Sequence, residues 1–175
     1  VVGVGMGVIG ATAGALGSFF GGYLGDRWGA RDERAYALIP AIGAMLGCAA
    51  YIAMFSVPSA IWSLSLYAAP SFMNNLWNGP ASLAVQNLAG ERARATALAL
   101  VLFVGSALGM GLGPLTVGLI SDAFAASMGE AEGLRRAIVI CAVVDILAGL
   151  CFWMASCSLR DDLAAVARNE TAEGR

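Results

Sequence analysis

Five runs of mostly apolar residues, each long enough to cross a lipid bilayer, limit what this chain can fold into. The runs cover residues 1–24, 35–56, 59–88, about 95–120 and 134–156. A hydrocarbon core about 30 Å thick needs about 20 helical residues to cross it. Charged residues make up 13% of the chain, about half their share in an average soluble domain, and most lie between or after the runs. A soluble fold would therefore lack polar surface.

The runs are predicted to be helices rather than strands. Lipid offers backbone groups no hydrogen-bonding partner, and a helix satisfies them within the segment. Barrel strands would be runs of about ten residues of alternating character. We therefore predict an all-α membrane protein, with five transmembrane helices in residues 1–159. Residues 160–175 form a charged tail, for which a short amphipathic helix and disorder both remain open.

Arginine sets the expected orientation, because the chain has no lysine. Eight of the ten arginines flank one side of the predicted membrane: Arg27, Arg31, Arg34, Arg92, Arg94, Arg160, Arg168 and Arg175. The positive-inside rule makes that side cytoplasmic, so we expect a cell-membrane protein with a cytoplasmic carboxy terminus and residue 1 outside. The net charge of -2 argues against a nucleic-acid partner.

Neither a metal site nor an enzyme is expected. The chain has no histidine, and its four cysteines lie within predicted spans or at a span end, where cysteine acts as a small apolar residue. No nucleophile has an evident base nearby. We therefore expect no cofactor and no catalytic activity.

The first run contains a stripe of small residues. Glycines recur at positions 3, 7, 10, 14, 17 and 21, a spacing that places all six on one helix face. Small residues at this spacing let two helix backbones approach closely in lipid. The stripe is compatible both with a rigid helix pair and with a helix that slides on its neighbour.

The loop after the first run carries a distinctive pattern. Asp26 lies at a helix carboxy end, where the helix dipole disfavours a carboxylate by a few tenths to about 1 kcal/mol, so it needs a cationic or helix-amino-terminal partner. The order Gly22, three residues, Asp26-Arg27, any residue, Gly29, any residue, Arg31 resembles the loop signature of the major facilitator superfamily. Asp32 departs from the fuller signature, which often has a basic residue there.

Three downstream stretches narrow the resemblance. Residues 86–95 and 109–122 resemble helices ten and eleven of the spinster-like branch, and residues 133–137 resemble the start of the last helix. The resemblance implies that the chain is helices eight to twelve, most of a carboxy-terminal half, and that its partner is a missing amino-terminal half. It also implies that Asp26, Arg27 and Arg31 form a conformational latch on the cytoplasmic side. A simple topology anchor is the alternative.

The third run is longer than a span requires and contains Pro70 and Gly79-Pro80. Each proline removes a backbone hydrogen bond, which frees the carbonyls of Leu66 and Leu76. A polar face follows the run, and its candidate residues for a substrate cavity are Tyr67, Ser71, Asn74, Asn75, Trp77, Asn78 and Gln86. Amides and hydroxyls avoid lipid, so this face meets either neighbouring helices or a water-filled pathway. We favour the pathway, and the resemblance points the same way.

The last two runs hold weaker signals. Gly105, Gly109 and Gly113 repeat every four residues up to Pro114, which predicts a close-packed helix with a kink. Asp145 lies near the middle of the last run, where an ionised carboxylate costs about 2.5–3.5 kcal/mol to insert. It is a possible proton site or a neutral structural acid.

The expected function is secondary transport. We expect a small organic or lipid-like solute to bind between this half and the missing half and to cross the bilayer by alternating access. The alternative is a non-transporting membrane protein that assembles with partners through its glycine-rich helix faces.

Overall fold

The computed structural model describes residues 2–57 and 59–173, so Val1, Pro58, Gly174 and Arg175 lie outside the described residues. The described chain is helical and contains no strand. Its elements are α1 (Val2–Gly29), α2 (Ala35–Ser56), α3 (Ala60–Leu66), α4 (Ala68–Asn75), α5 (Asn78–Gly105), the π-helix η1 (Ser106–Leu112), α6 (Gly113–Met128) and α7 (Glu130–Glu173). The all-α prediction is confirmed for these residues.

A short turn joins α1 to α2 and reverses the chain. The backbone N–H of Arg34 donates to the Asp32 carboxylate at 3.0 Å, and the N–H of Ala35 donates to the Asp32 carbonyl, also at 3.0 Å. Asp32, which departs from the superfamily signature, therefore holds the turn itself. Gly29 is buried against the Tyr36 ring, which leaves no room for a side chain at this position.

Proline positions explain why the third run is divided into short helices. Pro70 is the third residue of α4, and Pro80 is the third residue of α5. In the first turn of a helix the missing N–H has no intrahelical acceptor, so proline costs less there than in the interior, where α2 contains Pro40. The chain therefore ends one helix and starts the next just before each proline, at Tyr67 and at Leu76–Trp77.

Two glycines with positive φ make the later reversals. Gly90 (φ 67°, ψ 175°) bends α5 sharply. The part of α5 before Gly90 completes the third apolar run, and the part after it begins the fourth. Gly129 (φ 87°) joins α6 to α7, which packs antiparallel against it. The helix α7 continues through the predicted tail to Glu173, so the described part of the tail is helical.

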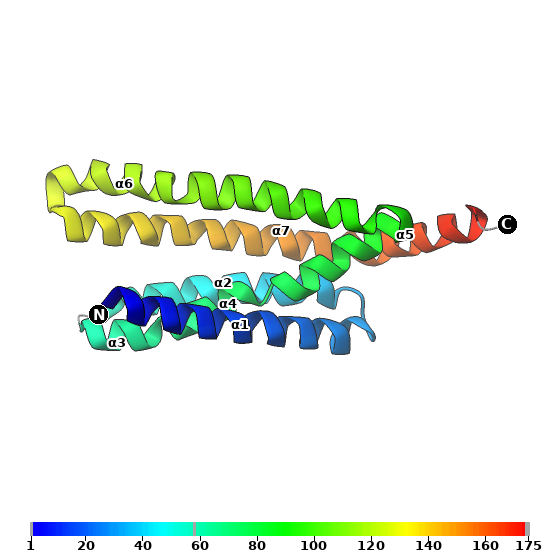
Figure 1. The fold of residues 1–175 in the computed structure, drawn as a ribbon, viewed down its shortest axis with the longest axis horizontal. Coiled ribbons are helices and arrows are strands. Elements are labelled where there is room, and N and C mark those ends of the chain that lie inside the picture. The colour runs from blue at the N-terminus through cyan, green and yellow to red at the C-terminus, as the bar shows by residue number, and fades with distance from the viewer. Residues whose placement is uncertain (1, 58, 174–175) are drawn as a thin grey trace.

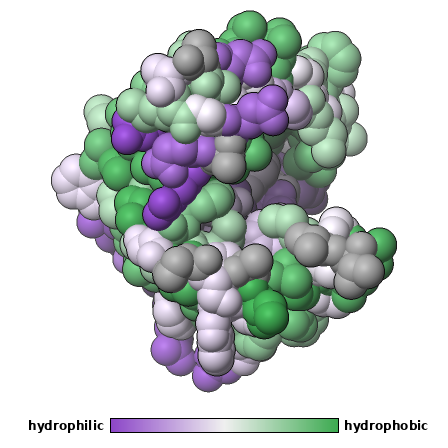
Figure 2. Space-filling view, turned by 90° about the vertical axis from the view of Figure 1, so that its left-hand side faces the viewer, coloured by the Kyte–Doolittle hydropathy of each residue, from purple (hydrophilic) through white to green (hydrophobic). Residues whose placement is uncertain are grey.

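The helices form two groups that run side by side (Figure 1). One contains α1 to α4 and the start of α5, and the other contains α6 and α7; α5 crosses from the first to the second. Contact between α2 and α7 joins the groups, and Gly149 of α7 lies close to the Ala41 carbonyl of α2. Seen from the end where α1 begins, the molecule is hollowed between the groups (Figure 2).

Within the described residues, four segments are long and apolar enough to cross a membrane: Gly3–Gly29, Ala35–Ser56, Arg92–Ala125 and Glu132–Arg168. The third run is not among them because its breaks leave only short helices. Large apolar side chains face outward, among them Phe103 at 70% and Met110 at 80% exposure. So much exposed apolar surface is expected where lipid or other transmembrane helices cover a protein.

Candidate substrate pathway and charged end

The glycine stripe of α1 packs against the broken segment. The positions where Gly17 and Gly21 would carry a Cβ atom are occupied by the backbone carbonyls of Phe72 and Leu76. The Leu76 carbonyl is one of the two that proline frees, so it points at the α1 backbone instead of at a helical N–H. Such Cα–H···O contacts are common where helices pack closely. Gly3 and Gly7, at the other end of the stripe, have no atom within 4 Å of that position.

An amide and hydroxyl network joins α1 to the same segment. The Asn78 side-chain NH2 donates to the Ser18 hydroxyl and to the Asn75 side-chain oxygen, both at 3.2 Å. The Ser18 hydroxyl donates to the Asn75 carbonyl at 3.5 Å, and the Asn75 NH2 donates to the Ser71 carbonyl at 2.8 Å. These groups are part-buried, and their hydrogen bonds are made within the protein. For Asn75 and Asn78 the structure shows the interhelical hydrogen bonds that the sequence left as one alternative.

Three more candidates lie along this contact or beyond it. Tyr67 is half-buried, with its ring and hydroxyl against Gly10 of α1. Ser71 is buried at 6% exposure, and Gln86 is half-buried one helical turn after Ser82, whose hydroxyl donates to the Asn78 carbonyl at 2.6 Å. Tyr67, Ser71, Asn75 and Asn78 therefore share the region that faces α1.

Asn74 and Trp77 lie on another side of the segment. Both are exposed, and both line a cavity of about 250 Å³ between α2, α4 and α7. Asp145 of α7 lines the same cavity, together with Met73 and Phe152. The sequence predicts one polar face with candidates on both of its flanks. In the structure Asn74 and Trp77 line the cavity with Asp145, whereas Asn75 and Asn78 join the network with α1.

Sequence reasoning missed several residues at these two places. Ser18 joins the amide network from α1, and its only sequence signal is its position beside Gly17 of the stripe. Tyr51 and Cys48 of α2 lie close enough to Asp145 to interact with it electrostatically. Nothing in the sequence places α2 next to Asp145, because that contact depends on how α2 and α7 pack.

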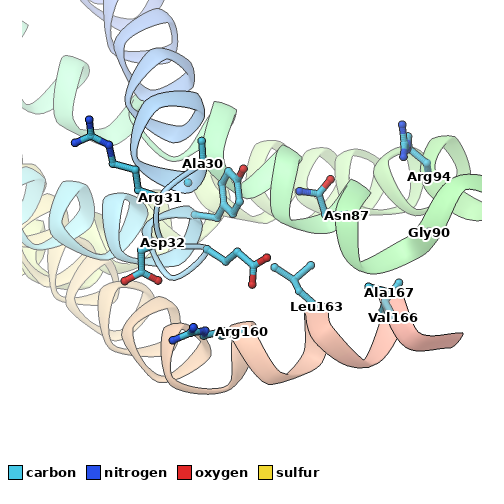
Figure 3. Close-up of a pocket in the computed structure, with 13 residues that line it drawn as sticks. Ala30, Arg31, Asp32, Asn87, Gly90, Arg94, Arg160, Leu163, Val166 and Ala167 are labelled. Atoms are coloured by element: carbon cyan, nitrogen blue, oxygen red, sulfur yellow. The ribbon is translucent and has the colours of Figure 1, made fainter. Parts of the chain in front are cut away.

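The residues of the expected latch lie at one end of α1. Asp26, Arg27 and Arg31 are exposed, and Arg27 donates to the Tyr23 hydroxyl at 3.3 Å. Gly22 has open space where a side chain would project. The loop lies beside α5 and the late part of α7, around a cavity of about 700 Å³ (Figure 3). Arg31, Arg94 and Arg160, each from a different segment, line it.

The glycines of the fourth run do not pack on the described chain. Gly105, Gly109 and Gly113 have no atom within 4 Å of their ideal Cβ positions, so close packing there stays a prediction. The helix is nevertheless irregular where it was expected to bend. The π-helix η1 covers Ser106–Leu112, and Pro114 occupies the first turn of α6. A π-helix inside a longer helix is rare and often occurs at functional sites.

One known protein resembles nearly the whole chain. The chain is 30% identical over 168 residues, 95% of its length, to an "MFS-type efflux pump" of Mycolicibacterium smegmatis. This similarity supports membership of the major facilitator superfamily. The chain spans 39% of that relative's length. No protein-family model matches the chain.

The helical structure fits a major facilitator membrane fold. The described chain has no strand and contains four long apolar helical segments. The apolar helices and the similarity together point to a membrane protein.

Proposed function

We propose that this chain is most of the carboxy-terminal half of a secondary transporter of the major facilitator superfamily. It corresponds to helices eight to twelve of a spinster-like carrier that moves a small organic or lipid-like solute across the cell membrane by alternating access. The observation that carries the proposal is the broken segment from Ala60 to Gly90, where polar side chains and freed carbonyls meet α1. Broken helices of this kind are characteristic of transporter binding sites.

The substrate pathway is proposed along the contact between α1 and the broken segment. Asn78, Asn75 and Ser18 bind one another across it, so their donors and acceptors are satisfied when no solute is present. A solute with polar groups can exchange for these bonds without leaving an amide unpaired in the membrane. Trp77, exposed at 38%, lies on another side of the segment and lines the cavity with Asn74.

The end of the molecule where α1 joins α2, which we call the charged end, is proposed to be cytoplasmic and to hold the latch. Arg31, Arg94 and Arg160 gather there around one cavity, which supports the orientation expected from the arginine count. Asp26 is exposed at the same end, with its carboxylate available to a cationic group or helix amino terminus of the missing amino-terminal half. Such a contact closes the cytoplasmic side while the carrier is open outward.

Intrachain packing weakens the non-transporting alternative. That alternative uses glycine-rich helix faces as assembly surfaces for partners, and the stripe of α1 is one of them. Gly17 and Gly21 are already covered by the backbone of Phe72 and Leu76 within the chain. The part of the stripe best suited to close packing is therefore not available to another protein.

Cysteine accessibility tests the proposed pathway. In the full-length protein with its native cysteines replaced, Asn74→Cys and Asn78→Cys are treated with a water-soluble thiol reagent from each side of the membrane. We expect Asn78→Cys to react because a solute pathway admits water, and Asn74→Cys to react because Asn74 is exposed in the cavity with Asp145. Phe103→Cys, at an apolar position that is 70% exposed, is the control and should stay unreactive in lipid. Inaccessibility of both Asn positions from both sides would contradict the pathway.

A further inference from the structure

The cavity between α2, α4 and α7 contains one carboxylate in mainly apolar surroundings. Asp145 lines it opposite Asn74 and Trp77, and the other lining side chains are uncharged. Asp145 is half-buried and lies fifteen positions after the start of α7 at Glu130, in the middle of the apolar segment Glu132–Arg168. An intramembrane carboxylate usually pairs with a cation or serves a function.

Among the residues that the structure describes, no cationic side chain lines this cavity. From α2, the ionisable groups near Asp145 are the Cys48 thiol and the Tyr51 hydroxyl, and Tyr51 lies close to Tyr67 and to the neutral Asn74. Asp122, the ionisable residue of α6, follows Ser121, whose carbonyl lies against Gly133 near the start of α7; Gly133 is about 18 Å along the helix from Asp145. On α5, Arg94 lies at the charged end with Arg160. The groups nearest to Asp145 are thus neutral at ordinary pH.

A carboxylate placed in this way becomes compatible with the membrane by taking up a proton. Protonation converts Asp145 from an acceptor into a neutral group that can both donate and accept. The Asn74 amide and the Tyr51 hydroxyl can each donate to or accept from a neighbour, so they can satisfy either form. We propose that this cavity is a proton-binding site in which the Asp145 carboxylate takes up a proton from water and returns it.

The site has a direct route to the proposed substrate pathway. Asn74 lines the cavity that contains Asp145. Asn75, the next residue, belongs to the amide network with α1. Both lie on α4, a helix of eight residues with a break at each end. A change in the hydrogen bonds of Asn74 can therefore rotate or shift α4 and alter the contact with α1. This coupling, unlike proton binding itself, rests on the proposed transport function.

Trp77 provides a reporter inside the cavity. In the full-length protein with every other tryptophan replaced by phenylalanine, Trp77 emission is measured while pH is varied through the range in which carboxylic acids titrate in proteins. We expect one transition, because the charge on Asp145 changes beside the indole. Asp145→Asn should remove the transition, and Asp122→Asn, the matched control, should keep it. A transition unchanged in Asp145→Asn, or none in the parent protein, would overturn the proposal.

A conservative variant and a flux measurement complete the test. If Asp145→Asn does not fold, Asp145→Glu should retain the transition with a displaced midpoint; an identical midpoint would count against Asp145.

In liposomes, proton uptake driven by an imposed pH gradient is then followed with a pH-sensitive dye, and Asp145→Asn should abolish the protein-dependent part. Titration of Trp77 without such uptake would overturn the coupling and leave proton binding standing. Uptake equal to that of the parent in Asp145→Asn would likewise overturn the coupling.

Discussion

Gly7 and Gly21 are equivalent in the sequence stripe of α1, but their surroundings differ. The Leu76 carbonyl occupies the space where Gly21 would carry a side chain, whereas Gly7 has no atom within 4 Å of that position. The sequence predicts that the stripe packs closely. Which glycines make the contact depends on where α4 ends and which carbonyl Pro80 frees, and no spacing rule encodes that.

Substitution by alanine should separate the two glycines. Gly21→Ala forces the Leu76 backbone to move, and we expect the free energy of unfolding to fall by about 1–3 kcal/mol. Gly7→Ala adds a methyl group in open space, so its stability should be unchanged or higher by up to about 1 kcal/mol from helix propensity. Reversible denaturation in detergent micelles measures both. Equal effects of the two substitutions would contradict the packing described for α1.

The polar candidates show how far residue-level prediction reached. The sequence correctly places amides and hydroxyls on a segment that meets α1, and Asn75 and Asn78 bind Ser18 there. It does not predict that Asn74 lines a cavity with Asp145, because that contact depends on how α7 packs against α2 and α4. Asn74 and Asn75 are adjacent in α4, where one residue turns the helix by about 100°, so the two side chains meet different helices.

At the scale of elements, proline positions were the most informative signal. Pro70 and Pro80 predict an interrupted third run, and each lies in the first turn of a new helix. The π-helix η1 was less predictable. The glycines around it suggest irregular backbone, but the register of a π-helix depends on small differences in hydrogen bonding that sequence patterns do not resolve.

The π-helix is expected to serve as a point of bending during transport. Gly109→Ala should favour regular α-helix by about 0.5–1 kcal/mol, a shift of about two- to fivefold in the balance of the two forms. We therefore expect slower transport at normal expression, measured as solute flux in liposomes. Gly118→Ala is the matched control, because Gly118 also has open space around it but lies in the regular helix α6. Equal flux in both variants would argue against a bending role.

At the scale of the whole molecule, composition and hydropathy predict most of the architecture. Apolar runs, the arginine distribution and the loop after α1 indicate a helical membrane protein, and the resemblance to an efflux pump over 95% of the chain supports this. The arrangement in two groups joined by α2 and α7 could not be predicted, since it depends on contacts between helices distant in sequence. The long helical tail was left open because its composition suits either state.

We propose that the full-length protein moves between states open to opposite sides, with Asp26 helping to close the cytoplasmic side. The most direct test compares labelling of Asn78→Cys from the two sides of the membrane, with Asp26 intact and with Asp26→Asn. Removing an exposed charge contact worth up to about 1 kcal/mol should raise the ratio of cytoplasmic to external labelling up to about fivefold. An unchanged ratio together with unchanged transport would contradict the latch, and labelling restricted to one side in every condition would contradict alternating access.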